Sequence, residues 1–248
     1  MHPALKFVQH RPWSLPNRPW IMAQNWHDLL FAHWEVPVAR IRDLVPRELE
    51  VDRFNGGAWI GVVPFTMSGV RLRGTPALPW ISAFPELNVR TYVTAEGKPG
   101  VWFFSLDAAR RAAVEAARLV FHLPYFYAWM TARKTGKNIA YSSLRKDRRG
   151  SGERLDAQYE PAGECFRAKL GTLEYFLTER YCLYARKPNG ALLRCEIHHA
   201  PWPLELARAE FACSTLMKGL RVELRGAPLL HFARLQEVIV WAPEIVRI

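Results

Sequence analysis

Long apolar runs and closely spaced cysteines are both missing from this 248-residue chain. The longest uninterrupted apolar stretch, residues 125–130, is six residues long, whereas a membrane-spanning helix needs about 18. The first 24 residues carry prolines and tryptophans instead of an apolar segment, so no signal peptide is expected. Half of the residues are apolar and 23% are charged, which excludes disordered, collagen-like and coiled-coil classes. We expect a single domain over 1–248, with an extended N-terminal arm at 1–25.

The four cysteines show neither a C-x-x-C pair nor zinc-like spacing; they are Cys165, Cys182, Cys195 and Cys213. This usage is typical of buried thiols in a reduced, cytoplasmic protein. The G-x-S-x-G, P-loop, G-x-G-x-x-G and H-E-x-x-H motifs are absent, which disfavours the enzyme classes that depend on them. We predict no cofactor and no metal site. The adjacent His198 and His199 would point to opposite faces of a strand, so at most one can face a pocket.

Positive charge is in excess, with 34 lysines and arginines against 23 acidic residues and a net charge of +11. Seven cations fall within 133–149; they are Arg133, Lys134, Lys137, Arg145, Lys146, Arg148 and Arg149. The run is either a polyanion-binding or nucleic-acid-binding surface or a solvated face that keeps the protein soluble. No nucleic-acid motif flanks it, which favours the second interpretation, and we predict an exposed basic loop at 145–158. Ten tryptophans leave room for an interface in a homo-oligomer.

Apolar periodicity and turn residues predict more strands than helices. The predicted strands are 58–66, 86–94, 100–106, 180–186, 191–198 and 229–241, and Pro64 in the first indicates a bulge or an edge. The predicted helices are 39–45, 107–121 with Asp107 as N-cap, a short one at 172–178, and 204–217. This pattern predicts a β-rich α+β fold whose antiparallel sheet closes into a barrel or closed sheet, because closure hides strand edges.

One face of the predicted strand 86–94 is polar and is the best candidate for a binding site. Glu86, Asn88, Arg90 and Tyr92 share this face. In a closed sheet they would point inward, where buried polar groups must satisfy one another or a ligand. The planar guanidinium of Arg90 suits a carboxylate, so we predict a small anionic or carbonyl-bearing ligand. In a solvent-facing sheet, or in a closed sheet filled by side chains, these residues would form no site.

The segment 174–181 is a second polar cluster. Glu174 and Thr178 would share one helix face at i and i+4. The cluster fits a binding site or a hydrogen-bonded core network equally well. The predicted binding residues from this part of the chain are Glu174, Glu179, Arg180 and His198.

Several passages between Trp26 and Leu204 resemble the YqjF-like family, a conserved bacterial group of unknown function (domain of unknown function 2071). The passages are WHDLLFAHWEVP, LVPRELEVDRFNGGAWIGVVPF, FPELNVRTYV, PGVWFFSLDAARRAAVEAARLVFHLPYFYA, GTLEYFLTERYCLY and EIHHAPWPL. This group in turn resembles, more distantly, the acetoacetate decarboxylase superfamily, whose members enclose a pocket in a β-barrel. The resemblance implies an acetoacetate decarboxylase-like fold for the whole chain.

The same resemblance implies roles for individual residues. FPELNVRTYV resembles the strand that carries an active-site glutamate, which would be Glu86, and Arg118 falls where that family has the arginine of its glycine-arginine-glutamate motif. After their helix the decarboxylases carry a proline and two lysines, one of which forms the Schiff base. Here Pro124 is followed by Tyr125 and Phe126. Schiff-base decarboxylation is therefore not expected of this chain.

The predicted catalytic residues are Tyr125, Glu86 and Asp107, and the predicted substrate-binding residues add Arg118 to those named above. Whether turnover occurs stays open; enolisation, hydrolysis or a lyase step by acid–base chemistry is the class expected. Each assignment has a structural alternative. Asp107 could cap a helix, Arg118 could pair with Glu115 on the surface, and Tyr125 could fill the core.

Overall fold

The computed structural model describes residues 2–77 and 82–247, and thirteen strands in these ranges form one sheet. The strands are β1 (Met22–Val36), β2 (Glu50–Val51), β3 (Ala58–Leu72), β4 (Phe84–Ala95), β5 (Lys98–Ala108), β6 (Tyr125–Thr135), β7 (Asn138–Arg145), β8 (Arg154–Pro161), β9 (Cys182–Arg186), β10 (Leu192–His198), β11 (Leu204–Ser214), β12 (Leu229–Val240) and β13 (Glu244–Ile245). The helices are α1 (Val38–Arg42), α2 (Arg111–Phe121) and α3 (Leu173–Thr178), with short 3-10 turns η1 (Pro3–Lys6) and η2 (Lys218–Leu220). None of the described helices is long and apolar enough to cross a membrane.

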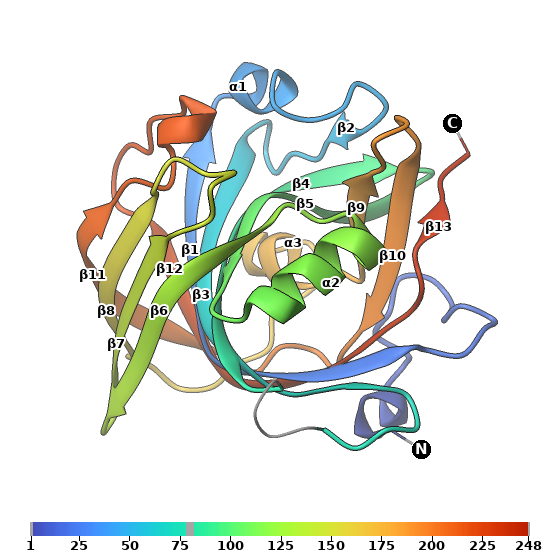
Figure 1. Ribbon diagram of the computed structural model, residues 1–248, viewed down its shortest axis with the longest axis horizontal. Helices are drawn as coiled ribbons and strands as arrows, with labels where there is room; N and C mark the ends of the chain where they lie inside the picture. The colour runs from blue at the N-terminus through green and yellow to red at the C-terminus, as the bar shows by residue number, and fades with distance from the viewer. Residues whose placement is uncertain (1, 78–81, 248) are drawn as a thin grey trace.

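The sheet closes on itself. Beyond the linear strand order, β4 pairs with β5 and β10 pairs with β12, which gives a closed ring β10-β9-β5-β4-β3-β1-β12. The pairings are antiparallel except those of β5 with β6 and with β9. Figure 1 shows α2 and α3 inside the outline of this ring. The β-rich α+β fold with a closed sheet is therefore confirmed.

Residues on the inner faces of β1, β3 and β4 are held in a defined register. Gly61, Val63, Phe65 and Met67 of β3 lie opposite alternate residues of β4, from Arg90 to Phe84. The register of β1 against β3 shifts between positions 27 and 32, where Asp28 has a φ of 48°. Such a shift is a β-bulge, and its extra residue lies in β1, opposite Pro64. The sequence instead predicts a bulge or an edge in the strand that carries Pro64, whereas β3 pairs with β4 through Pro64 without a shift.

One predicted helix begins at the wrong residue, and another predicted helix is a strand. Asp107 lies inside β5 and does not cap α2, which begins at Arg111 after an Arg110 cap without a side-chain hydrogen bond. The range 204–217 is largely strand β11, paired with β8 and β12. Its alanines, glutamates and leucines are good helix formers, but tertiary pairing on both sides overrides this preference.

The predicted exposed loop 145–158 is shorter than expected. Arg145 ends β7 with its side chain 6% exposed, and β8 begins at Arg154, so only 146–153 connects the two strands. The burial of Arg145 has an electrostatic cause, because its guanidinium donates to Asp107 at 2.7 Å and pairs with Glu153 at 3.0 Å. Charge composition alone cannot reveal such partners.

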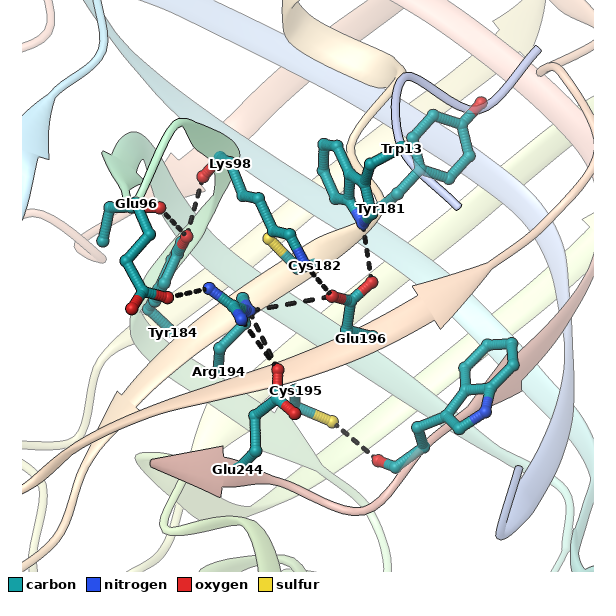
Figure 2. Close-up of polar contacts among 12 residues, drawn as sticks. Trp13, Glu96, Lys98, Tyr181, Cys182, Tyr184, Arg194, Cys195, Glu196 and Glu244 are labelled. Atoms are coloured by element: carbon teal, nitrogen blue, oxygen red, sulfur yellow. Dashed lines mark hydrogen bonds and ion pairs between the residues drawn. The ribbon is translucent and has the colours of Figure 1, made fainter. Parts of the chain in front are cut away.

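The segment before β1 packs on β9 and β10 through a buried ionic network. Glu196 of β10 accepts hydrogen bonds from Trp13 Nε1 and Lys98 Nζ, both at 2.7 Å, and also from the guanidinium of Arg11. The side chains of Arg11 and Glu196 are 1% and 2% exposed. Figure 2 shows Glu196 beside Arg194, which bridges to neighbouring acids. This network fixes the N-terminal segment to the closed sheet.

We expect Glu196→Ala to cost about 3–5 kcal/mol in the free energy of unfolding, because it leaves the buried Arg11 guanidinium without its counter-charge. Urea unfolding at 25 °C measures the loss. The matched control is Glu223→Ala, because the pair of Glu223 with Arg225 is 72% and 83% exposed and should cost less than about 1 kcal/mol. Equal losses in the two variants would contradict the assigned role of Glu196.

Candidate functional site

A cavity of about 300 Å³ lies within the closed sheet, beneath α2. Most of its wall is apolar and overlaps one of the core clusters, which includes Leu29, Phe31, Val63, Phe65 and Trp202. Apart from the tryptophan indoles and the cysteines, the polar side chains that line it are Gln24, Glu86, Asn88, Tyr125, Arg90, Thr178, Arg180 and His199. An apolar cavity with a few convergent polar groups is the usual form of a small-molecule site.

Strand β4 supplies the polar wall because its alternate residues face the cavity. Glu86, Asn88 and Arg90 all line it, and all are at most 9% exposed. Room for Arg90 comes from Gly61 on β3, because a Cβ there would stand 3.3 Å from Arg90 Cγ and 3.0 Å from the His33 imidazole. The predicted inward face of this strand is thus present for its first three polar residues.

Arg90 carries a buried positive charge that forms no ion pair with any described residue. Its Nη2 donates to the backbone oxygen of Leu177 at 3.2 Å, while its buried Nε has no hydrogen-bond partner among the described residues. The guanidinium carbon lies 5.4 Å from the centre of the Phe31 ring. Arg180 differs, because its Nη1 donates to Asp52 at 2.6 Å. Arg90 is therefore the cation best placed to receive an anion.

Glu86 and Tyr125 form a hydrogen-bonded pair in the cavity wall. The Tyr125 hydroxyl donates to Glu86 Oε2 at 3.0 Å. Burial raises the pKa of Glu86 to about 8, against the lowering effect of the Tyr125 hydrogen bond, and burial likewise raises the pKa of Tyr125 well above its usual value. At neutral pH, Glu86 is therefore mainly a carboxylic acid. A neutral acid in a cavity can give a proton to a bound molecule.

Two more cavity-lining polar atoms lack partners. Asn88 Oδ1 and Trp202 Nε1 are buried and form no hydrogen bond with any described residue. A buried donor or acceptor without a partner costs roughly 1–3 kcal/mol. With Arg90 Nε, three residues of the wall carry two donors and one acceptor that have no partner among the described residues.

The wall opposite β4 comes from the segment after α3 and from the end of β10. Arg180 is held by Nε donation to Phe176 O at 2.6 Å and by Asp52, and Thr178 lies beside it at the cavity. His199 lines the cavity with Nδ1 2.8 Å from Ala200 O. Burial lowers the pKa of His199 to about 4, so its imidazole is neutral at pH 7.

Other predicted site residues lie next to the cavity without lining it. The Tyr92 hydroxyl donates to Leu177 O at 2.8 Å and lies 2.6 Å from His33 Nε2, beneath α3. Arg118 donates through Nη1 to the backbone oxygen of Tyr125 at 2.8 Å. It therefore holds the Tyr125 backbone from α2 without lining the cavity itself, and it does not form the surface ion pair with Glu115, whose partner is Arg149.

The remaining predicted residues face elsewhere. The Asp107 carboxylate bonds to Arg145, and its pKa is raised to about 6 by burial, against the lowering effect of that arginine. Glu179 accepts from the Tyr181 hydroxyl and from Trp202 N, the latter at 2.9 Å, and so fixes one wall residue. His198 contacts the N-terminal segment through Ala4 O and Phe7 O, both at 3.0 Å.

Glu174 is a half-buried residue of α3, and its backbone oxygen accepts from Thr178 Oγ1 at 2.7 Å. This bond uses the backbone of Glu174 and leaves its carboxylate out of the cavity wall. The segment 174–181 is thus divided between a core network and the site.

Sequence reasoning missed several wall residues. Trp26 and Trp202 stack with ring centres 6.0 Å apart, and Trp202 meets Phe31 edge-on at 4.9 Å. Trp26, Leu29 and Phe31 line the cavity, but residues 26–31 do not alternate in polarity, because the β-bulge at Asp28 changes which residues face inward. His199 and Trp202 follow the end of β10 at His198, where no periodicity indicates which way a side chain points.

The basic run 133–149 lies on the hairpin of β6 and β7, where several of its charges are paired. Lys134 meets Asp28 at 2.7 Å, Arg149 meets Glu115 and Asp147, and Lys146 lies 4.4 Å from the centre of the Trp129 ring. These contacts leave fewer free cations than the sequence suggests. Polyanion binding stays a prediction that no contact here specifically favours.

Chemical groups for other mechanisms are not gathered in the described residues. No cluster of three or more His, Cys, Asp and Glu side chains with metal-binding geometry occurs there. None of the described cavity-lining residues is a lysine, and Tyr125 follows Pro124 in the wall. No amine is therefore available in that wall for a Schiff base.

The fold has counterparts of known structure. It is similar to acetoacetate decarboxylase from Legionella pneumophila, with a TM-score of 0.62 and 10% identity over 98% of this chain and 94% of that one. It is also similar to an acetoacetate decarboxylase-like enzyme from Sphingomonas wittichii RW1, with a TM-score of 0.64 and 12% identity over 97% and 100%. The enduracididine biosynthesis enzyme MppR, solved with pyruvate, is similar with a TM-score of 0.62 and 10% identity, over 96% of this chain and 93% of that one. These likenesses establish the fold as acetoacetate decarboxylase-like.

Sequence comparison gives the closer relationship. The chain is 47% identical over 234 residues to uncharacterized protein YqjF of Bacillus subtilis (strain 168), covering 94% of this chain and 96% of that protein. Residues 23–237 match the model of DUF2071, described as an uncharacterized conserved protein. The chain therefore belongs to the DUF2071 family.

Proposed function

We propose that the cavity binds a small organic acid or carbonyl compound, with its carboxylate on Arg90. The observation that supports this most is the buried Arg90 guanidinium, which lines the cavity without an ion pair among the described residues. A buried arginine without a counter-charge is costly, and a bidentate carboxylate supplies charge and geometry together. MppR, which shares the fold, was solved with pyruvate, a molecule of this class.

We further propose that the bound molecule undergoes acid–base chemistry without a Schiff base. Glu86, held as a neutral acid, would give its proton to a carbonyl oxygen of the bound compound. Tyr125 already donates to Glu86 Oε2 and would stabilise the carboxylate that forms. Arg118 would act as a positioning residue through the Tyr125 backbone.

We expect carboxylates to stabilise the wild type in a thermal-shift screen, and matched primary amides to do so much less. The panel is unbranched monocarboxylic and 2-oxo acids of two to ten carbons. Arg90→Ala should remove the stabilisation because the guanidinium that receives the carboxylate is gone. Arg90→Lys should keep part of it, since the charge stays but the planar fork is lost.

The control for this screen is Arg225→Ala, which removes an 83% exposed arginine of the same charge. Its ligand-induced shift should equal that of the wild type. A full shift in Arg90→Ala, or equal shifts for acids and amides, would show that the carboxylate is not held at Arg90.

The protonation of Glu86 predicts a specific pH dependence of stability. Its pKa is raised to about 8 in the fold, above the ordinary glutamate value of 4.5. Between these two pH values the folded state therefore holds a proton that the unfolded state has lost. Stability from this group therefore falls as pH rises through that window. Between pH 6 and pH 9, the wild type should lose about 3 kcal/mol more than Glu86→Gln. Urea unfolding at the two pH values measures the difference.

The control is Glu223→Gln. Between pH 6 and pH 9 its free energy of unfolding should fall by the same amount as that of the wild type, because the Glu223 carboxylate is 72% exposed. If Glu86→Gln and the wild type lose stability in parallel, Glu86 is already ionised at neutral pH. The proposed role of Glu86 as a proton donor would then be wrong.

A further inference from the structure

Polarity is graded along the cavity. On β4 the inward residues run from Arg90 through Asn88 and Glu86 to Phe84, and the strand register sets Phe84 opposite Met67 of β3. Beyond this point the lining residues of β3 are apolar, ending at Leu72, which pairs with Met22 of β1. One end of the cavity is therefore charged, and the other is hydrocarbon apart from Gln24 of β1, whose side-chain oxygen accepts from Trp26 Nε1 at 2.8 Å.

The roof over the cavity is built from small side chains of α2. Ala113, Ala116 and Ala117 all line the cavity, together with Val120 and Phe121. Alanine reaches only as far as Cβ, so this helix covers the cavity without filling it. Larger apolar side chains at the same positions would take up the space that a ligand could use.

The cavity has an apolar exposed margin. Leu72 and Val120 line it and are nevertheless 62% and 51% exposed. The neighbouring Leu119 of the same helix is 78% exposed. Part of the cavity rim is therefore both apolar and open to solvent. The Arg90 end is buried, so this margin is where a ligand would enter, with its charged group leading.

Charge at the polar end suits one negative group. The ionisable lining side chains, cysteines and Tyr125 apart, are Glu86, Arg90, Arg180 and His199. Arg180 is paired with Asp52, which leaves Arg90 as the lining cation that has no ion pair among the described residues. If Glu86 ionised, its carboxylate would repel a second anionic group on the ligand.

We propose that the ligand is an amphipathic monocarboxylic acid, whose carboxylate binds Arg90 and whose apolar body of about six to ten carbons lies under α2. This inference rests on the proposed function and adds the chemical class of the ligand. A volume of about 300 Å³ holds on the order of ten to twenty non-hydrogen atoms, which fits such a molecule. Dicarboxylates and short polar acids would leave the apolar end unused or place a charge in it.

The test is isothermal titration calorimetry of the full chain with butyrate, hexanoate, octanoate and decanoate, and with adipate as the dicarboxylate matched to hexanoate. Affinity should rise up to about fourfold for each methylene that becomes buried, and should then level off. Adipate should bind at least tenfold more weakly than hexanoate, because its second carboxylate would meet the apolar wall.

Ala117→Phe supplies the second measurement, since the ring would project from α2 into the cavity. As the acids become longer, the affinity of Ala117→Phe for them should stop rising at a chain at least two carbons shorter than for the wild type. Ala112→Phe is the matched control, because Ala112 is exposed on the same helix and does not line the cavity. If Ala117→Phe does not fold, the titrations of the wild type with the monocarboxylates and adipate still test the proposal.

The outcomes separate this inference from the proposed function. If carboxylates bind better than amides and need Arg90, but affinity does not depend on chain length or adipate matches hexanoate, the inference is overturned and the proposed function stands. If carboxylates show no advantage over amides, the proposed function fails and the inference fails with it.

Discussion

The burial of a polar strand face is the constraint on which the rest of this molecule depends. β4 carries Glu86, Asn88 and Arg90 into a closed sheet, where bulk water cannot satisfy them. Each must be neutralised, hydrogen-bonded or left for a ligand. Glu86 is held neutral by burial and accepts from Tyr125, whereas Arg90 donates to a backbone carbonyl and forms no ion pair among the described residues. This imbalance is what makes the cavity a candidate site.

The surrounding structure holds this arrangement in place by indirect contacts. Arg118 bonds to the Tyr125 backbone, and Glu179 bonds to the Trp202 backbone, so two residues behind the wall fix two residues in it. The N-terminal segment adds a second layer through Arg11 and Glu196 on the outer side of β10. The side chains that face the cavity are thus positioned by ionic and backbone contacts that the ligand would never touch.

Much of this could be predicted from the sequence, and the parts that could not have a common physical reason. The alternation from Glu86 to Tyr92 showed which residues share a face, and a closed sheet turned that face inward for Glu86, Asn88 and Arg90. Alternation says nothing about what covers a strand, so α3 over Tyr92 was not foreseeable. The strand register sends Asp107 to Arg145, a partner 38 residues away. The helix-forming residues of β11 led to the wrong prediction of a helix for the same reason, because strand pairing depends on residues that are distant in the sequence.

Gly61 ties the shape of the cavity to a single backbone position. A Cβ there would be in tight contact with both the His33 ring and Arg90 Cγ, at 3.0 and 3.3 Å, so these side chains would have to shift by a few tenths of an ångström. An arginine at 90 in this position therefore disfavours a larger residue at 61. Among relatives of this chain, a substitution at 61 should accompany a change at 90. The two positions together would then distinguish relatives that have the charged end of the cavity from relatives in which the same fold has a different cavity.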